Sequence, residues 1–260
     1  MSQSLARALR ILAALGEGER SLDELAAQHD VHKTTVLRLL RTLEEERFVY
    51  RDGRHRYHLG AQLFALSSRA LEQRGIRATA APHLAELNQS TGQTVHLATY
   101  EGGEVVYVDK YDSRHPVRMY SRIGLRASLH GAAVSKVLLG GLPPEELERV
   151  LARIEYRRTT PNTIGSAEEL RAEVARAAER GWATDHEENE PSINCVAAPV
   201  RDASGEIVAA ISISVPDIVL SYEELLELRP RLLETARAIS GDAGWRPASG
   251  EAGRTGHGTR

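Results

Sequence analysis

The sequence predicts a protein of the α+β class built in two parts, a small helical module followed by a larger mixture of strands and helices. Three observations carry this prediction. Apolar residues follow a helical spacing through much of residues 5–45. An Asp-Gly pair at 52–53 separates two short β-prone runs. From residue 93 onward, β-prone runs are mixed with helical ones, and 260 residues leave room for two domains at roughly 150 residues each.

Three helices are expected in the first part. Apolar residues at helical spacing predict the first over 5–15. Ser21 and Glu24 have the spacing of a capping box, which predicts that a short second helix begins there. After a turn at 28–31, an apolar stripe predicts a third helix over 33–45. Two helices joined by a short turn are the elements of a helix-turn-helix.

The outer face of the third helix carries side chains that can donate hydrogen bonds to phosphates and base edges. A hairpin with basic residues around its Asp-Gly turn follows directly, which makes the module a winged helix-turn-helix. The candidate DNA-binding residues are Lys33, Thr34, Thr35, Arg38 and Arg41 on the helix, and Arg51, Arg54 and Arg56 in the wing.

The distribution of charge supports this interpretation, although the total does not. The chain has 33 Lys and Arg against 36 Asp and Glu, a net charge of −3, which taken alone argues mildly against a nucleic-acid partner. Residues 31–60, however, carry an excess of Lys and Arg over acidic residues. The positive charge is local, and acidic residues elsewhere outweigh it.

The rest of the chain predicts a linker helix and a separate α+β domain. Residues 61–75 have helical periodicity, and another helix is expected over 78–89. The segments expected to be strands are 93–100, 105–110, 117–122, 182–187, 193–201 and 206–215, and the later helices are expected over 131–140, 166–180 and 221–239. The predicted domains are therefore 1–60, the linker 61–75, a domain over 76–245 and a disordered tail over 246–260.

Several segments resemble the IclR family of bacterial transcriptional regulators, over nearly the whole chain except the tail. Residues 31–43 (VHKTTVLRLLRTL) resemble the family's recognition helix, and 56–60 (RYHLG) its junction between wing and linker. The run 181–188 (GWATDHEE), followed by 195–197 (CVA) and 200–202 (VRD), is similar to the family's effector-domain signature. Residues 129–139 (LHGAAVSKVLL) also resemble a segment of the family. Two positions depart from the pattern: Arg201 replaces an aromatic residue or His, and Ser135 replaces a Gly.

The resemblance implies a winged helix, a linker helix and a GAF-like C-terminal domain that binds a small effector, assembled as a homodimer or homotetramer. It also implies effector contacts at eight positions, which combine apolar walls with a few polar groups. Ser212 and Ser214, two apart on a predicted strand, point to one face of it, although they could equally bond neighbouring backbone. The candidate effector-binding residues are Met119, Ala127, Ala133, Val134, Asp185, Cys195, Ser212 and Ser214.

Catalysis and metal binding are the less favoured interpretations. Cys195, the single cysteine, could line the pocket, pack as a small apolar residue, or act as a nucleophile with His130 or His186 as base. No local catalytic signature surrounds it. Residues 185–188 (DHEE) alternate between the faces of a strand and cannot all converge on a metal. We therefore expect no enzyme activity, no metal and no cofactor.

The sequence thus predicts a cytoplasmic transcription factor, because no charged-then-apolar leader opens the chain and no apolar run is long enough to span a membrane. We expect it to bind double-stranded, pseudo-palindromic operator DNA and to repress a catabolic or metabolic operon under the control of an organic-acid effector. The alternatives are an activator of the same family, an enzyme with a GAF-like domain that uses Cys195, and an architectural DNA-binding protein without an effector.

Overall fold

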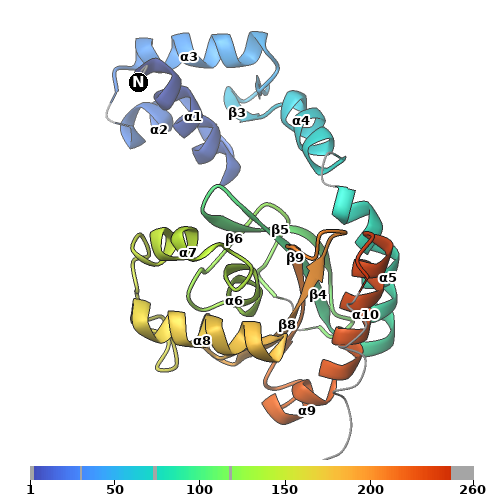
Figure 1. Ribbon diagram of the computed structural model, residues 1–260. Coiled ribbons are helices and arrows are strands. Elements are labelled where there is room, and N and C mark those ends of the chain that lie inside the picture. Colours follow the sequence, from blue (N-terminus) through green and yellow to red (C-terminus); the bar gives the residue numbers. More distant parts are fainter. Residues whose placement is uncertain (1–2, 30, 73–74, 117–118, 247–260) are drawn as a thin grey trace, which may run out of the picture. The chain divides into compact units, whose positions relative to one another are not determined.

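The computed structural model describes residues 3–29, 31–72, 75–116 and 119–246 (Figure 1). The chain divides into two compact units, Met1–Gln73 and Arg74–Arg260. The division falls within the segment 61–75 that the sequence predicts as a linker helix. Apart from Arg246, the expected tail 246–260 lies outside the described residues.

The first unit joins a helical cluster to a small antiparallel sheet. The three predicted helices are present, and a two-residue strand that was not expected adds to the hairpin, giving the strand order β1-β3-β2. The elements are α1 (Gln3–Gly16), β1 (Arg20–Ser21), α2 (Leu22–Gln28), α3 (Lys33–Glu45), β2 (Val49–Arg51), β3 (Arg56–Leu59) and α4 (Ala61–Glu72).

Local signals place these helices where the sequence predicts them. The Ser21 hydroxyl accepts a hydrogen bond from the Glu24 amide, and the Ser21 amide donates to the Glu24 carboxylate, so the capping box begins α2. The apolar stripe of α3 is buried, with Leu40 completely enclosed and Val36 almost so. It packs against apolar residues of α1, α2 and the hairpin. The second helix of the helix-turn-helix is thus held by one face, and its other face is left to solvent.

A close backbone approach fixes the junction between the wing and α4. A Cβ atom added at Gly60 would lie 2.2 Å from the carbonyl oxygen of Arg47, so only glycine fits there. The Gly60 amide donates to the Phe48 carbonyl at 2.7 Å, and the Gln62 amide donates to the Arg47 carbonyl at 3.1 Å. The first turn of α4 is therefore bonded to the segment that enters the wing.

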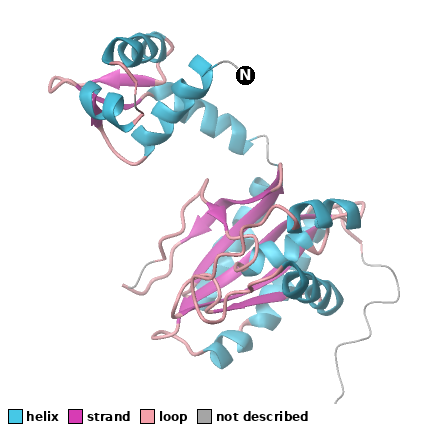
Figure 2. Cartoon of the chain, turned by 90° about the vertical axis from the view of Figure 1, so that its left-hand side faces the viewer, coloured by secondary structure: helices cyan, strands magenta, loops and turns pink. Residues whose placement is uncertain are grey.

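The second unit is an antiparallel sheet with helices on both faces (Figures 1 and 2). Its strands have the order β6-β5-β4-β9-β8-β7. The elements are α5 (Gly75–Thr91), β4 (Thr94–Glu101), β5 (Glu104–Tyr111), β6 (Arg126–Ala127), α6 (Ala133–Leu139), α7 (Pro144–Leu151), α8 (Ala167–Arg180), β7 (Ala183–His186), β8 (Ile193–Arg201), β9 (Ile207–Pro216), α9 (Tyr222–Glu227) and α10 (Arg229–Asp242). No helix in the described part of the chain combines the length and apolar character needed to cross a membrane.

The two faces of this sheet differ in composition. Helices α5 and α10 cover one face of the sheet (Figure 1). Leu97, Ile211 and Ile213 point to this face and belong to the larger apolar core. Ala98 and Ala210 point to the opposite face, against α6. Because strand side chains alternate, Ser212 and Ser214 lie on this second face with Ala210. Small residues there leave space between the sheet and α6.

Two predictions of secondary structure in this unit were wrong, and one helix was not predicted. Residues 119–122 of the expected strand 117–122 form no strand, and 117–118 lie outside the described residues; the edge strand is β6 instead. The expected helix 221–239 is two helices, because Pro230 lacks the amide hydrogen needed to continue the first one. Helix α7 was not among the expected helices; Pro144 occupies its first turn, where the missing amide hydrogen costs no intrahelical bond.

Candidate functional site

The exposed face of α3 carries most of the candidate DNA-binding residues. Lys33, Arg38 and Arg41 are exposed, Thr34 is exposed, and Thr35 is half-buried. The Lys33 ammonium lies 2.8 Å from a carboxylate oxygen of Asp23, and both side chains are largely in solvent. Within the described residues, the side chains of Arg38 and Arg41 form no ion pair. Their charges remain available to an anionic partner.

Asp52 organises the wing. One of its carboxylate oxygens accepts hydrogen bonds from the amides of Arg54 and Arg56, at 2.9 and 2.8 Å. The other lies 3.1 Å from Nε2 of His58. Donation by the Arg56 amide, followed by the contact with His58, lowers the pKa of Asp52. The turn therefore presents exposed Arg51 and Arg54 side chains from a backbone that is bonded internally.

Arg56 lies at the base of the wing rather than at its tip. Its Nε is 3.0 Å from a carboxylate oxygen of Glu19, and a terminal nitrogen is 3.0 Å from a carboxylate oxygen of Glu24. Its side chain is 29% exposed. One guanidinium contact joins β3 to the residue before β1 and the other joins it to the first turn of α2, so Arg56 stabilises the module internally. We therefore limit the proposed wing contacts to Arg51 and Arg54.

Replacing Asp52 by alanine is expected to loosen the wing while leaving the helices folded. The amides of Arg54 and Arg56 would both lose the carboxylate oxygen to which they donate. Their hydrogens should therefore exchange with solvent several-fold faster. Hydrogen exchange followed by NMR measures this directly. Asp52→Asn, which keeps an acceptor oxygen, is the matched control. Equal protection in Asp52→Ala and wild type would show that the carboxylate does not hold the turn.

The second candidate site is a cavity of about 480 Å³ between the sheet and α6. All eight candidate effector-binding residues line it: Met119, Ala127, Ala133, Val134, Asp185, Cys195, Ser212 and Ser214. His96, Tyr107, Ser121 and Asn189, which the sequence did not predict, also line it. His96 lies directly opposite Ser212 in the pairing of β4 with β9. The pairing register of β4 with β9 would have placed His96 in the cavity, but the sequence of neither strand determines that register.

A buried imidazole connects two walls of the cavity. His96 Nε2 lies 2.7 Å from the Ser121 hydroxyl, and its Nδ1 lies 3.5 and 3.4 Å from the hydroxyls of Ser212 and Ser214. Burial, with a further contribution from the charge of Lys110, lowers the pKa of His96 to about 3. The ring is therefore neutral near pH 7, with one nitrogen that donates and one that accepts. With the hydroxyls, it suits an oxygen-rich ligand.

The segment around Ser121 is held by a lysine. Lys110 Nζ donates to the main-chain carbonyls of Met119 and Ser121, at 3.1 and 2.6 Å, and lies 2.8 Å from a carboxylate oxygen of Asp112. These bonds fix the backbone of residues 119–121 beside β5 without the main-chain pairing of a β-sheet. They explain why β-prone residues there form a wall of the cavity instead of the expected strand.

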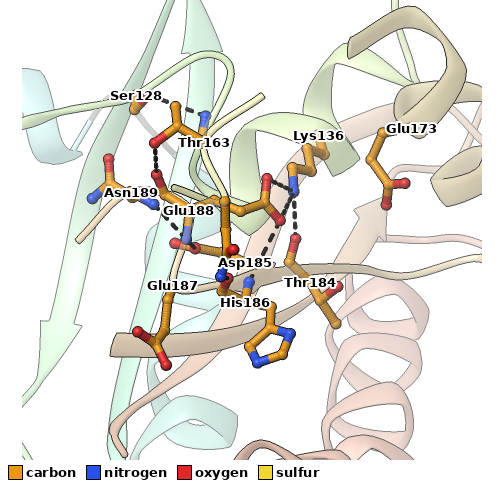
Figure 3. A network of polar contacts seen from close by, with 12 residues as sticks. Ser128, Lys136, Thr163, Glu173, Thr184, Asp185, His186, Glu187, Glu188 and Asn189 are labelled. Carbon is orange, nitrogen blue, oxygen red and sulfur yellow. Dashed lines mark hydrogen bonds and ion pairs between the residues drawn. The ribbon is translucent and has the colours of Figure 1, made fainter. Parts of the chain in front are cut away.

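Asp185 contributes a buried carboxyl group at the end of β7 (Figure 3). Its Oδ1 accepts hydrogen bonds from the amides of Glu188 and Asn189, at 2.7 and 3.2 Å. Burial raises the pKa of Asp185 to about 7, although these amides and the charge of Lys136 favour the ionised form. The group thus titrates near neutrality.

An ion pair and three threonines hold the loop that follows Asp185, and Figure 3 shows the ion pair and one of these threonines, Thr163. Lys136 Nζ lies 2.6 and 2.7 Å from the two carboxylate oxygens of Glu188, and it donates to the Thr184 carbonyl. The hydroxyls of Thr159, Thr160 and Thr163 donate to main-chain carbonyls of residues 187–189. The spacing of these threonines carried no signal in the sequence, because their partners lie more than twenty positions away.

The geometry does not assemble a cysteine nucleophile. Burial and then the neighbouring charge of Asp185 raise the pKa of the Cys195 thiol well above its ordinary value, so it is protonated near pH 7. The Nε2 of His130 contacts the Arg157 carbonyl, and the His186 ring stacks on Tyr222, so both candidate bases are engaged elsewhere. His96, with its lowered pKa, is a weak base. The thiol acts as part of the cavity wall.

Two family models cover most of the chain. The model described as "IclR helix-turn-helix domain" matches residues 4–53, and "Bacterial transcriptional regulator IclR C-terminal" matches residues 68–241. The chain belongs to the IclR family. It is therefore a DNA-binding transcriptional regulator with an N-terminal helix-turn-helix and a C-terminal effector domain, as the sequence predicts, and not an enzyme.

Two relatives and one solved structure match this IclR-family member over nearly their whole length. It is 37% identical to the transcriptional regulator KdgR of Escherichia coli (strain K12), over 93% of each chain. It is 33% identical to the transcriptional repressor AllR of Klebsiella pneumoniae, over 95% of this chain and 92% of that one. The crystal structure of the Thermotoga maritima IclR protein has a TM-score of 0.78 and 34% identity, covering 94% of this chain and all of that one.

Proposed function

We propose that this IclR-family regulator represses a catabolic or metabolic operon in the cytoplasm and releases its operator when a small organic acid occupies the C-terminal cavity. The observation that carries the proposal is the 480 Å³ cavity, whose polar groups converge from the sheet and from the loop after β7. Its volume is within the range of small-molecule sites. The relatives named AllR are repressors, which supports the sign of regulation.

The proposed DNA contacts are on α3 and in the wing. Arg38 and Arg41 would contact base edges or phosphates in the major groove, together with Lys33, Thr34 and Thr35. Arg51 and Arg54 would contact the sugar-phosphate backbone or the minor groove. The exposure of the basic side chains and the absence of ion pairs at Arg38 and Arg41, within the described residues, support this assignment.

Apolar side chains exposed on the first unit support assembly with a second copy of the chain. Leu5 and Leu9 of α1 are 61% and 57% exposed, and Phe64 of α4 is 75% exposed. Large apolar groups in solvent commonly mark a protein interface. In a homodimer, or in a tetramer formed from two dimers, two-fold symmetry would match a pseudo-palindromic operator with half-sites about one helical turn apart.

Site selection from random duplex DNA followed by fluorescence anisotropy tests the proposal. We expect the selected sites to share a pseudo-palindrome, and the logarithm of affinity to fall linearly with the logarithm of salt concentration. Adding an organic acid that raises the melting temperature of the protein should release the DNA. Binding that is independent of salt would contradict the DNA assignment, and failure of every acid to stabilise the protein would contradict the effector assignment.

A further inference from the structure

The carboxyl group of Asp185 lies in the cavity among groups of mostly negative or neutral character. Its Oδ1 accepts hydrogen bonds from two main-chain amides, and Asp185 is the strand partner of Cys195 in the pairing of β7 with β8. The titratable and charged groups that face it are Lys136 from α6, Glu188 and Glu190 from the loop after β7, Cys195 from β8 and Tyr107 from β5.

The cavity offers no unpaired cation to an anionic ligand within the described residues. Lys136 is 1% exposed, and its Nζ is occupied by both oxygens of Glu188. Arg126 is the one basic residue among the described lining residues, and its Nε pairs with Glu104 at 2.8 Å. His96 is neutral near pH 7. An incoming carboxylate would therefore meet the negative charge of Asp185 without a compensating positive one.

We propose that the effector's carboxylate binds beside Asp185 and that the protein takes up one proton as it does so, which leaves the two carboxyl groups joined by one hydrogen bond. This inference rests on the organic-acid effector proposed above. Two carboxylates that share a buried site cannot both be ionised without strong repulsion, so one retains a proton. The proton passes from solvent to the Asp185 carboxyl, which then donates to the ligand oxygen.

The titration of Asp185 near neutrality makes this uptake accessible. With a pKa of about 7, the carboxyl group of Asp185 is protonated in a substantial fraction of the molecules at neutral pH. A nearby ligand carboxylate raises that pKa further. The acid binds the form of the protein in which Asp185 is protonated. Its affinity should therefore be constant at pH values below the pKa of Asp185 and should fall at pH values above it. A ligand that presents a hydroxyl donor to Asp185 would instead favour ionisation and release a proton.

Isothermal titration calorimetry on the full chain tests the proposal. The probes are D-glucuronate and benzoate, each compared with its uncharged amide, from about pH 6 to about pH 8.5. Affinity for the acids should fall about tenfold for each pH unit above the titration of Asp185. Measurements in phosphate and Tris buffers, whose ionisation enthalpies differ, should report uptake of about one proton per ligand above that pH. The amides add no negative charge beside Asp185 and offer it both a donor and an acceptor, so they should show a much weaker pH slope and no uptake of a whole proton.

Two variants assign the proton. Asp185→Asn keeps an oxygen for the amides of Glu188 and Asn189 and adds a permanent donor, so it should bind the acids with no pH slope and no proton uptake. Glu234→Gln, which neutralises an exposed acid of α10 outside the cavity lining, should keep the wild-type slope. Melting temperature and operator binding check that both variants are folded.

The outcomes separate this proposal from the one it rests on. Acids that bind wild type equally at both ends of the pH range, or with proton release, would overturn the proton coupling and leave the acid effector in place. A slope retained by Asp185→Asn would overturn the assignment to Asp185. If the amides bind and neither acid binds at any pH, the acid effector itself is wrong, and the coupling is overturned with it.

Discussion

Lys136→Met is expected to lower the free energy of unfolding of the C-terminal unit by about 3–5 kcal/mol, because it leaves a buried carboxylate without its partner. Lys136 is almost completely enclosed, and Glu188 is 12% exposed. The substitution also removes the donor to the Thr184 carbonyl. Urea unfolding followed by tryptophan fluorescence reports on this unit alone, because both tryptophans of the chain, Trp182 and Trp245, belong to it.

Two further variants show whether burial is the cause. Lys136→Met/Glu188→Gln removes the stranded charge and should recover part of the lost stability. Arg171→Met breaks a pair of similar geometry between α8 and α7, Arg171 with Glu148, and should stay close to wild type because that pair is exposed. A loss in Lys136→Met no greater than that in Arg171→Met would mean that the buried pair contributes little.

Arg38→Ala is expected to weaken binding to the selected operator by about 1–3 kcal/mol for each base that the arginine recognises, or about 2–6 kcal/mol when both subunits of a dimer carry the substitution. Anisotropy titrations at a single salt concentration, on the operator and on a scrambled duplex, measure the change. Arg237→Ala removes an equal charge from an exposed position of α10 and should bind both duplexes as wild type does. An equal weakening on both duplexes would mean that Arg38 binds a phosphate rather than a base.

The N-terminal unit was predictable because its signals are local. The capping box at Ser21, the apolar stripe of α3 and the Asp-Gly turn each depend on residues a few positions apart. Local signals could not show that Arg56 is paired within the module rather than free to contact DNA. Its carboxylate partners lie more than thirty positions earlier in the chain, and a charge pattern does not distinguish an arginine in solvent from one that is paired.

The cavity was predictable only in part. Its eight candidate residues came from the family resemblance, and the structure brings them together around one space. His96 and Tyr107 were not predicted because their position depends on the pairing of β4 with β5 and β9. The incorrect prediction of a strand at 117–122 has a related cause. β-propensity identifies residues that suit a pleated surface, but it does not show that a neighbouring strand is available to pair with them.

The close approach at Gly60 has a mechanical consequence. The amides of Gly60 and Gln62 donate to the carbonyls of Phe48 and Arg47. Because residue 60 has no side chain, the two backbone segments are in direct contact. Helix α4 and the hairpin therefore cannot rotate freely about residue 60. A rotation of α4 would therefore be transmitted to α3 through these hydrogen bonds. We expect the N-terminal unit to move on its operator as one rigid body.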